Sequence, residues 1–132
     1  MKYSYTPDRA YRLFVRPFGF FMILGGVILF FSGFFIPTEL LFLPPLDDAV
    51  VKRVVFCALS LLYIPLGIGF CLRSKTAWWG FFAVMLVGII WHVIAGILNP
   101  HFAFLAILSP VLNIPIATGI FFVTKPAFLS KP

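Results

Sequence analysis

Four long apolar runs, separated by short polar or proline-containing segments, dominate the chain. They cover residues 18–36, 50–72, 77–98 and 102–124, and the only Asp, Glu, Lys or Arg residues within them are Lys52 and Arg53. A helix needs about 20 mostly apolar residues to cross a bilayer, and each run is close to that length. The pattern predicts an all-α membrane protein, a single domain over residues 1–132 with four antiparallel transmembrane helices.

The segment before the first run predicts a short amphipathic helix over residues 7–16. Thr6 suits the N-cap and Pro7 suits the first helical position. Pro17 disfavours helical geometry at the residue before it, so we expect the chain to break there and to restart with the first span. We expect this helix to lie on the cytoplasmic headgroups, where three basic side chains at helical spacing contact anionic lipid: Arg9, Arg12 and Arg16.

The largest feature outside the apolar runs is the loop over residues 37–49. Its stretch from Leu40 to Leu43 is too apolar for free solvent, so we expect the loop to fold onto the membrane surface or onto a partner. Asp47 and Asp48 end the loop at the start of the second run, where the positive end of a helix dipole favours acidic side chains. We therefore interpret the two acids as helix caps.

The ten Lys and Arg residues are distributed unevenly between the two sides that this topology creates. Lys52 and Arg53 fall on one side, together with Glu39 and the two loop aspartates. All the other basic residues lie on the opposite side, in the N-terminal segment, in the loop at residues 73–76 and in the tail after residue 124. Because Lys and Arg are retained in cytoplasmic loops, we expect both termini to be cytoplasmic and the protein to reside in the cytoplasmic (inner) membrane.

Composition agrees with this topology and narrows the classes of function. Apolar residues make up 62% of the chain and charged residues 11%, against roughly 25% charged in soluble domains. The net charge of +6 is explained by topology and by anionic lipid. No basic face with base-stacking aromatics lies outside the apolar runs, so we expect no nucleic-acid partner.

The third apolar run holds the one ionisable residue well inside a predicted span, His92. It shares a helix face with small and polar residues, which is typical of a face turned toward other helices. The tight turn at residues 99–101 places Ser109 of the fourth run about opposite His92. We expect the two side chains to lie at the same depth.

The fourth run is interrupted by prolines. Pro110 and Pro115 cannot donate to the carbonyl groups of Ala106 and Val111, and freed carbonyls need partners in a medium without water. Asn113 is a candidate donor for one of them. These residues together predict a polar seam between the third and fourth spans, formed by His92, Ser109 and Asn113.

Several interpretations of His92 stay open. It can join helices structurally, through Ser109 or a freed carbonyl. It can instead bind a haem or a (bacterio)chlorophyll, because a neutral imidazole beside Gly88, Ala95 and Gly96 leaves room for a flat macrocycle. A role in proton or small-molecule traffic is a third hypothesis.

The sequence carries no nucleophile–base pair, no cluster of metal ligands and no glycine-rich phosphate loop. We therefore assign no catalytic residue and no metal ligand, and we expect a protein that is not an enzyme. The main hypothesis is a small membrane subunit, or an assembly or scaffold protein, that packs laterally against a larger membrane complex. The alternatives are a haem- or chlorophyll-binding protein using His92, and a small channel or transporter acting as a homodimer.

Overall fold

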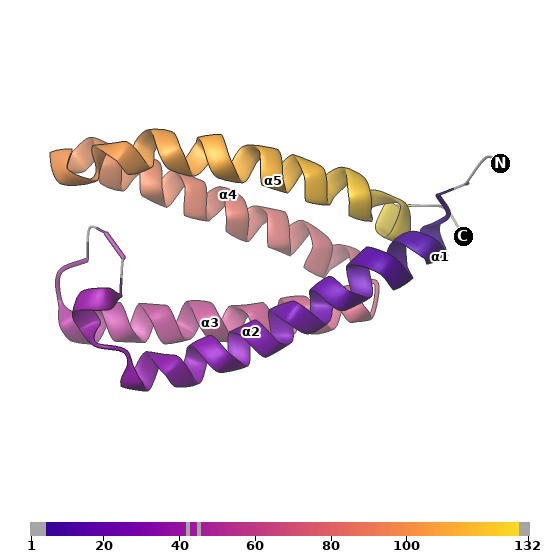
Figure 1. Ribbon diagram of the computed structural model, residues 1–132, viewed down its shortest axis with the longest axis horizontal. Coiled ribbons are helices and arrows are strands. Elements are labelled where there is room, and N and C mark those ends of the chain that lie inside the picture. Colours follow the sequence, from indigo (N-terminus) through magenta and orange to yellow (C-terminus); the bar gives the residue numbers. More distant parts are fainter. Residues whose placement is uncertain (1–4, 42, 45, 130–132) are drawn as a thin grey trace.

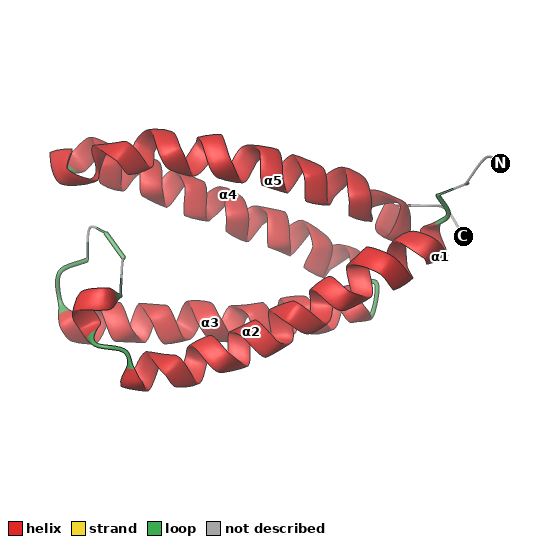
Figure 2. Ribbon diagram, viewed as in Figure 1, coloured by secondary structure: helices red, strands yellow, loops and turns green. Residues whose placement is uncertain are grey.

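A computed structural model of the chain describes residues 5–41, 43–44 and 46–129. Every regular element within these residues is helical, and none of them forms a strand (Figure 2). In chain order, the elements are α1 (Pro7–Ala10), η1 (Tyr11–Val15), α2 (Arg16–Phe35), η2 (Thr38–Leu40), α3 (Ala49–Cys71), α4 (Lys75–Leu98), η3 (Pro100–Phe102) and α5 (Ala103–Leu129). The described residues contain four helices that are long and apolar enough to cross a membrane, which confirms the four predicted apolar helices.

Short-range hydrogen bonds define where these helices begin. The Thr6 side chain accepts a hydrogen bond from the backbone N–H of Arg9, and Asp48 accepts one from Val51 at 2.9 Å. Ser74 caps α4 in the same way, by accepting from Ala77 at 3.3 Å. Such side chains satisfy backbone donors that have no partner in the first turn of a helix.

The expected break before Pro17 is absent. Residues 7–16, predicted as a separate helix, instead form the first part of one long helix from Pro7 to Phe35. A π-helical turn, η1, joins α1 to α2, and the backbone N–H of Arg16 bonds to the carbonyl of Tyr11 five residues earlier. This wider turn changes the register of the backbone hydrogen bonds just before the proline. The first helix therefore passes through Pro17 without a break.

The long helices pack as two pairs (Figure 1). α2 lies along α3, and α4 lies along α5; we call them the first and the second helix pair. Glycines permit the closest approach in the first pair. A Cβ atom added at Gly67 would lie 2.6 Å from the carbonyl oxygen of Gly19, so only glycine fits at this crossing.

The two pairs meet at one end and diverge toward the other (Figure 1). Where they meet, tightly packed rings form what we call the aromatic cluster: Phe18, Phe70, Trp78, Phe81, Phe121 and Phe128. Phe70 and Trp78 are fully buried, and Trp78 Nε1 donates to Thr124 Oγ1 at 2.7 Å. The start of α1, the loop between α3 and α4 and the end of α5 all lie at this end (Figure 1).

Candidate functional site

The polar seam predicted from the sequence lies between α4 and α5. His92 Nδ1 is 3.0 Å from Ser109 Oγ. Asn113 Nδ2 is 2.8 Å from the Ser109 carbonyl oxygen and 3.3 Å from Ser109 Oγ. The structure therefore brings the three seam residues into one hydrogen-bonded chain.

Ser109 differs from the other Ser and Thr residues of the long helices whose hydroxyl groups form hydrogen bonds. Four of these donate to the carbonyl four residues earlier, each at 2.7 Å: Ser32, Ser60, Thr118 and Thr124. Ser109, whose side chain is buried, makes no such bond within the described residues. Its hydroxyl proton is therefore free to be donated elsewhere.

Donor and acceptor chemistry assigns the protons in this chain. The Asn113 amide nitrogen must face Ser109, because a carbonyl oxygen only accepts; this nitrogen therefore also donates to Ser109 Oγ. The Ser109 proton then has one acceptor among the described groups, which is His92 Nδ1. This favours the neutral His92 tautomer with its proton on Nε2; the 3.0 Å contact itself is compatible with either direction.

Nε2 of His92 is not fully buried. Within residues 5–41, 43–44 and 46–129 every buried side-chain nitrogen or oxygen has a hydrogen-bond partner, and Nε2 makes none there. The face that carries it is set by Phe81, eleven residues earlier and about 20° away around the helix. Phe81 packs against Phe18 and Phe70 of the first helix pair, with ring centroids 5.4 and 5.6 Å apart. His92 therefore lies near the α4 face that Phe81 presents to the first pair, while its imidazole contacts Ser109 of α5.

This proton arrangement bears on the hypothesis of a haem or (bacterio)chlorophyll at His92. A ligating nitrogen needs its lone pair, whereas Nε2 is protonated while Ser109 donates to Nδ1. Ligation would require Nδ1 to carry the proton and the buried Ser109 hydroxyl to find another acceptor. Among the described residues, no three His, Cys, Asp or Glu side chains come together in a way that could hold a metal ion.

Asn113 does not reach either of the carbonyls that the prolines free. It donates to Ser109, four residues earlier, rather than to Ala106 or Val111. The reason is that both freed carbonyls belong to its own helix, where an amide side chain reaches the carbonyl one turn back more readily. Sequence reasoning thus found the residue but assigned the wrong acceptor.

Three other polar residues of the long helices bond within the first helix pair. Ser60 Oγ donates to Phe56 O at 2.7 Å, and Cys57 Sγ lies 3.9 Å from Phe30 O. The hydroxyl of Ser32 bonds to the carbonyl of Ile28 in its own helix. These three side chains do not join the polar seam.

The arginines predicted to contact lipid headgroups lie in the first helix, at the end where the pairs meet. Arg9, Arg12 and Arg16 are exposed, and the Arg16 guanidinium lies 5.8 Å from the ring centroid of Phe20. Contact with anionic lipid remains a prediction for all three. Lys131 of the basic tail lies outside the described residues.

Three contacts that the sequence did not indicate tie separate parts of the chain together. Arg53 donates to the carbonyls of Gly33 and Ile36, the latter at 3.2 Å, and so caps the end of α2 with a positive charge. Trp91 Nε1 donates to the Pro44 carbonyl, which joins α4 to the loop over residues 37–49, called the outer loop below. At the opposite end Tyr11 donates to the carbonyl of Cys71. Their partners are backbone carbonyls, which side-chain patterns do not reveal.

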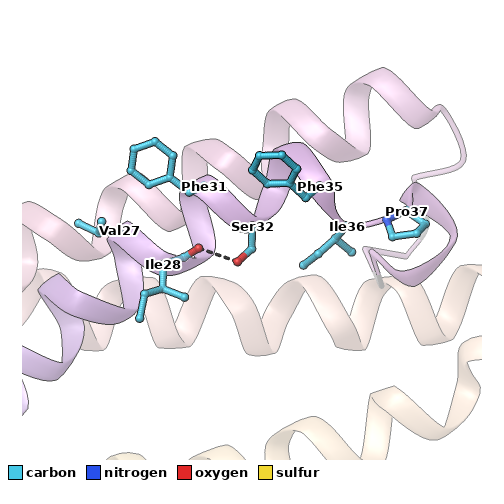
Figure 3. Close-up of a pocket in the computed structure, with 7 residues that line it drawn as sticks. All are labelled: Val27, Ile28, Phe31, Ser32, Phe35, Ile36 and Pro37. Atoms are coloured by element: carbon cyan, nitrogen blue, oxygen red, sulfur yellow. Dashed lines mark hydrogen bonds between the residues drawn. The ribbon is translucent and has the colours of Figure 1, made fainter.

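Two surface depressions accompany the helix pairs. The larger, about 570 Å³, lies on α2 and is lined by Val27, Ile28, Phe31, Ser32, Phe35, Ile36 and Pro37 (Figure 3). The smaller, about 230 Å³, lies between the start of the first helix and α5, and includes Phe14, Phe18 and Gly119. Both are lined mainly by apolar side chains, and Ser32 already donates its proton to Ile28. The polar seam is therefore the better candidate for specific recognition.

Comparisons with known protein families, with curated protein sequences and with solved structures find no match to this chain.

Proposed function

We propose that the chain is an integral protein of the cytoplasmic membrane, with four antiparallel transmembrane helices and both termini in the cytoplasm. Four long apolar helices support the membrane part of this proposal. The basic residues support the orientation, because most of them fall on the same side of the proposed membrane topology. They are Arg9, Arg12, Arg16, Arg73, Lys75 and Lys125. Trp78 and Trp79 belong to the same end, as expected for a belt at the headgroups.

A reporter fused to the C-terminus tests the orientation. A reporter active only in the cytoplasm is expected to work, and one active only in the periplasm is expected to be silent. The opposite pattern would contradict the proposed topology.

We further propose that the protein is a small non-catalytic subunit, or an assembly or scaffold protein, that packs laterally against a larger membrane complex. The uncovered surface of α5 carries this proposal. In the most apolar window of the helix Pro100–Leu129, only 6% of residues are buried inside the chain, against 22% in the first two long helices. Large side chains such as Ile107 and Phe122 are 70% and 65% exposed. A broad apolar helix face of this kind suits lateral contact with another membrane protein.

Crosslinking within the native membrane tests this role. A photoreactive residue is placed at Ile107 or Phe122 on α5, with Phe35 on α2, which is 84% exposed, as the matched control position. We expect large crosslinked species from the α5 positions and few from Phe35, and the same partners in mild-detergent purification. A chain that purifies alone as a homodimer would contradict the subunit role and favour the channel or transporter hypothesis.

A further inference from the structure

Prolines inside α5 leave backbone carbonyl groups without their usual helical donor. Three prolines lie within the helix, at positions 110, 115 and 126. Each lacks the N–H group that would bond to the carbonyl four residues earlier, so the freed carbonyls belong to Ala106, Val111 and Phe122. A carbonyl in the hydrocarbon core of a bilayer has no water to bond and needs another donor. The surroundings of the three groups therefore decide where that donor comes from.

The Val111 carbonyl differs from the other two in its position. Ala106 lies on the side of α5 that packs against α4, where a Cβ atom added at Gly96 would lie 2.8 Å from the Ala106 Cβ. Phe122 lies two residues before the end of the proposed span at residue 124, close to headgroups and water. Val111 lies nine residues after the start of that span at residue 102, or about 14 Å along the helix. This is near the middle of a hydrocarbon core about 30 Å thick.

The Val111 carbonyl also lies on the exposed face of α5. A helical carbonyl points along the helix, toward the residues three and four positions later, which here are Ile114 and Pro115. Val111 and Ile114 are 60% and 54% exposed, and Pro115 is exposed as well. Ser109 and Asn113, the α5 residues of the polar seam, lie about 160° around the helix from Val111. The contacts with α4 therefore cover the opposite side of α5.

No side chain in the described part of the chain donates to the Val111 carbonyl. The hydroxyl of Thr118 lies on the same face, but it donates to the carbonyl of Ile114 at 2.7 Å. The amide of Asn113 donates to Ser109 on the opposite side. Lipid chains have no donor. The exposed face of α5 thus presents an acceptor, deep in the proposed span, that neither lipid nor a side chain of this chain satisfies.

We propose that this face binds a transmembrane helix of another protein, and that the partner helix donates a side-chain hydrogen bond to the Val111 carbonyl. The donor is a hydroxyl, amide or indole group, because these groups donate without bringing a charge into the membrane. Apolar contact on both sides of the hydrogen bond comes from exposed residues whose spacing suits packing along a second helix. They are Ile107, Val111, Ile114 and Phe122.

The depth of the carbonyl favours a different protein over a second copy of this chain. Copies with the same topology in one membrane are related by an axis along the membrane normal, so each residue meets the partner copy at its own depth. The exposed residues of this face at the depth of the carbonyl are Val111, Ile114 and Pro115, and none has a side-chain donor. A homodimer through this face would leave both carbonyls without a donor.

This inference rests on the proposed subunit role and names the contact through which α5 takes part in it. The two can fail separately. Loss of the crosslinks from Ile107 and Phe122 would contradict the subunit role itself. Crosslinks that persist, together with unchanged partner binding in Pro115→Ala, would contradict the hydrogen bond alone.

The test returns the missing donor to the helix. Pro115→Ala supplies an N–H group to the Val111 carbonyl, so the donor of the partner loses its acceptor. The partner retained on the tagged chain in mild detergent, measured over a dilution series, gives the apparent affinity. We expect this affinity to fall about 3- to 10-fold, the effect of one hydrogen bond.

A matched substitution separates the N–H group from the loss of the proline ring. The α-hydroxy analogue of alanine, placed at position 115 by nonsense suppression, has the methyl side chain of alanine but no N–H group. It is expected to retain the partner as the wild type does. Pro110→Ala, which supplies a donor to the Ala106 carbonyl on the α4 side, is also expected to leave partner binding unchanged. Circular dichroism and thermal unfolding establish that each variant retains its helices.

A photoreactive residue at Ile114, beside the carbonyl, identifies the occupant. We expect a crosslink to a transmembrane helix of another protein, within one turn of a hydroxyl, amide or indole side chain. A crosslink to a second copy of this chain, or to lipid alone, would overturn the proposal. So would unchanged binding in Pro115→Ala, or an equal loss in Pro115→Ala and in either of the two control substitutions.

Discussion

Ser109 and His92 illustrate how one hydroxyl can determine the chemistry of a neighbouring ring. The Ser109 hydroxyl accepts from Asn113, and His92 Nδ1 is the acceptor left for its proton, because it donates to no carbonyl of its own helix in the described structure. A hydroxyl that bonded its own backbone, as Ser60 does, would leave the imidazole free to exchange tautomers. The sequence could predict that Ser109 and His92 lie at similar depth, but it could not predict the direction of the proton.

Replacing Ser109 with alanine is expected to release the His92 tautomer. In the wild type, ¹⁵N NMR of labelled histidine should show neutral His92 with its proton on Nε2, because Ser109 donates to Nδ1. Ser109→Ala should give a mixture of the two tautomers, with His101 as an internal control. A wild-type signal that already shows the mixture would contradict the proton assignment.

Asp8 forms an exposed ion pair that links the N-terminal helix to the loop between α3 and α4. Its carboxylate lies 2.7 Å from the Arg73 guanidinium, which also lies over the ring of Tyr11. The hydrogen bond and the charge of Arg73 lower the pKa of Asp8. Asp8 precedes the proposed first span at residue 18.

The pH dependence of this contact follows from the direction of the shift. A carboxyl whose pKa is lower in the folded state stabilises the fold fully above its unfolded pKa, about 3.9 for Asp. That contribution is lost as the pH falls through the lowered value. NMR titration should find the Asp8 pKa below its ordinary value in the wild type and closer to it in Arg73→Gln. Equal pKa values in the two proteins would show that the ion pair does not persist in solution.

At the scale of elements, the helices are defined locally but their contacts are not. Caps such as Thr6 and Asp48 were readable from sequence because each acts within one turn. The continuity of the first helix could not be read from the sequence. It depends on the backbone hydrogen bonds of the turn that precedes Pro17. The π turn at Tyr11–Val15 shows that a proline at this position is compatible with a continuous helix.

Two glycines in different environments should respond oppositely to a methyl group. At Gly67 a Cβ atom would lie 2.6 Å from Gly19 O, so Gly67→Ala must push α2 away from α3. Overpacking of this kind costs about 1–3 kcal/mol. At Gly25 a Cβ meets nothing, and Gly25→Ala should stabilise the helix by up to about 1 kcal/mol.

Reversible unfolding of the detergent-solubilised chain, followed by circular dichroism, measures both effects. Equal stability changes in the two variants would contradict the close contact between Gly19 and Gly67.

At the scale of the whole molecule, the two helix pairs are connected very differently at their two ends. The aromatic cluster joins them at one end through the buried side chains of Phe70 and Trp78. At the other end, the outer loop reaches α4 through the hydrogen bond between Trp91 and Pro44. The mobility of the outer end should therefore depend strongly on Trp91.

Replacing Trp91 with phenylalanine removes this hydrogen bond and keeps an aromatic ring. Spin labels at the exposed positions Phe31 and Ile94 should then show a broader distance distribution than in the otherwise wild-type protein. Labels at Phe20 and Ala83, nearer the aromatic cluster, serve as the control and should be unaffected. Broadening at both ends would mean that Trp91 stabilises the whole molecule rather than the outer bridge.

The sequence by itself determined the four apolar helices, the caps at Thr6 and Asp48 and the residues of the polar seam. These features follow from local chemistry: runs long enough to span a bilayer, polar side chains one turn from a free backbone donor, and a tight turn that pairs His92 with Ser109. Only the tertiary structure decided that the helices form two diverging pairs, which the aromatic cluster joins at one end. The physical reason is that nearly every face of these helices is apolar, so the pattern that distinguishes packed from solvent-facing sides in soluble proteins is absent. Which faces meet then depends on shape, such as the contact of Gly67 with Gly19, and on the stacking of aromatic rings, which become defined when the helices pack.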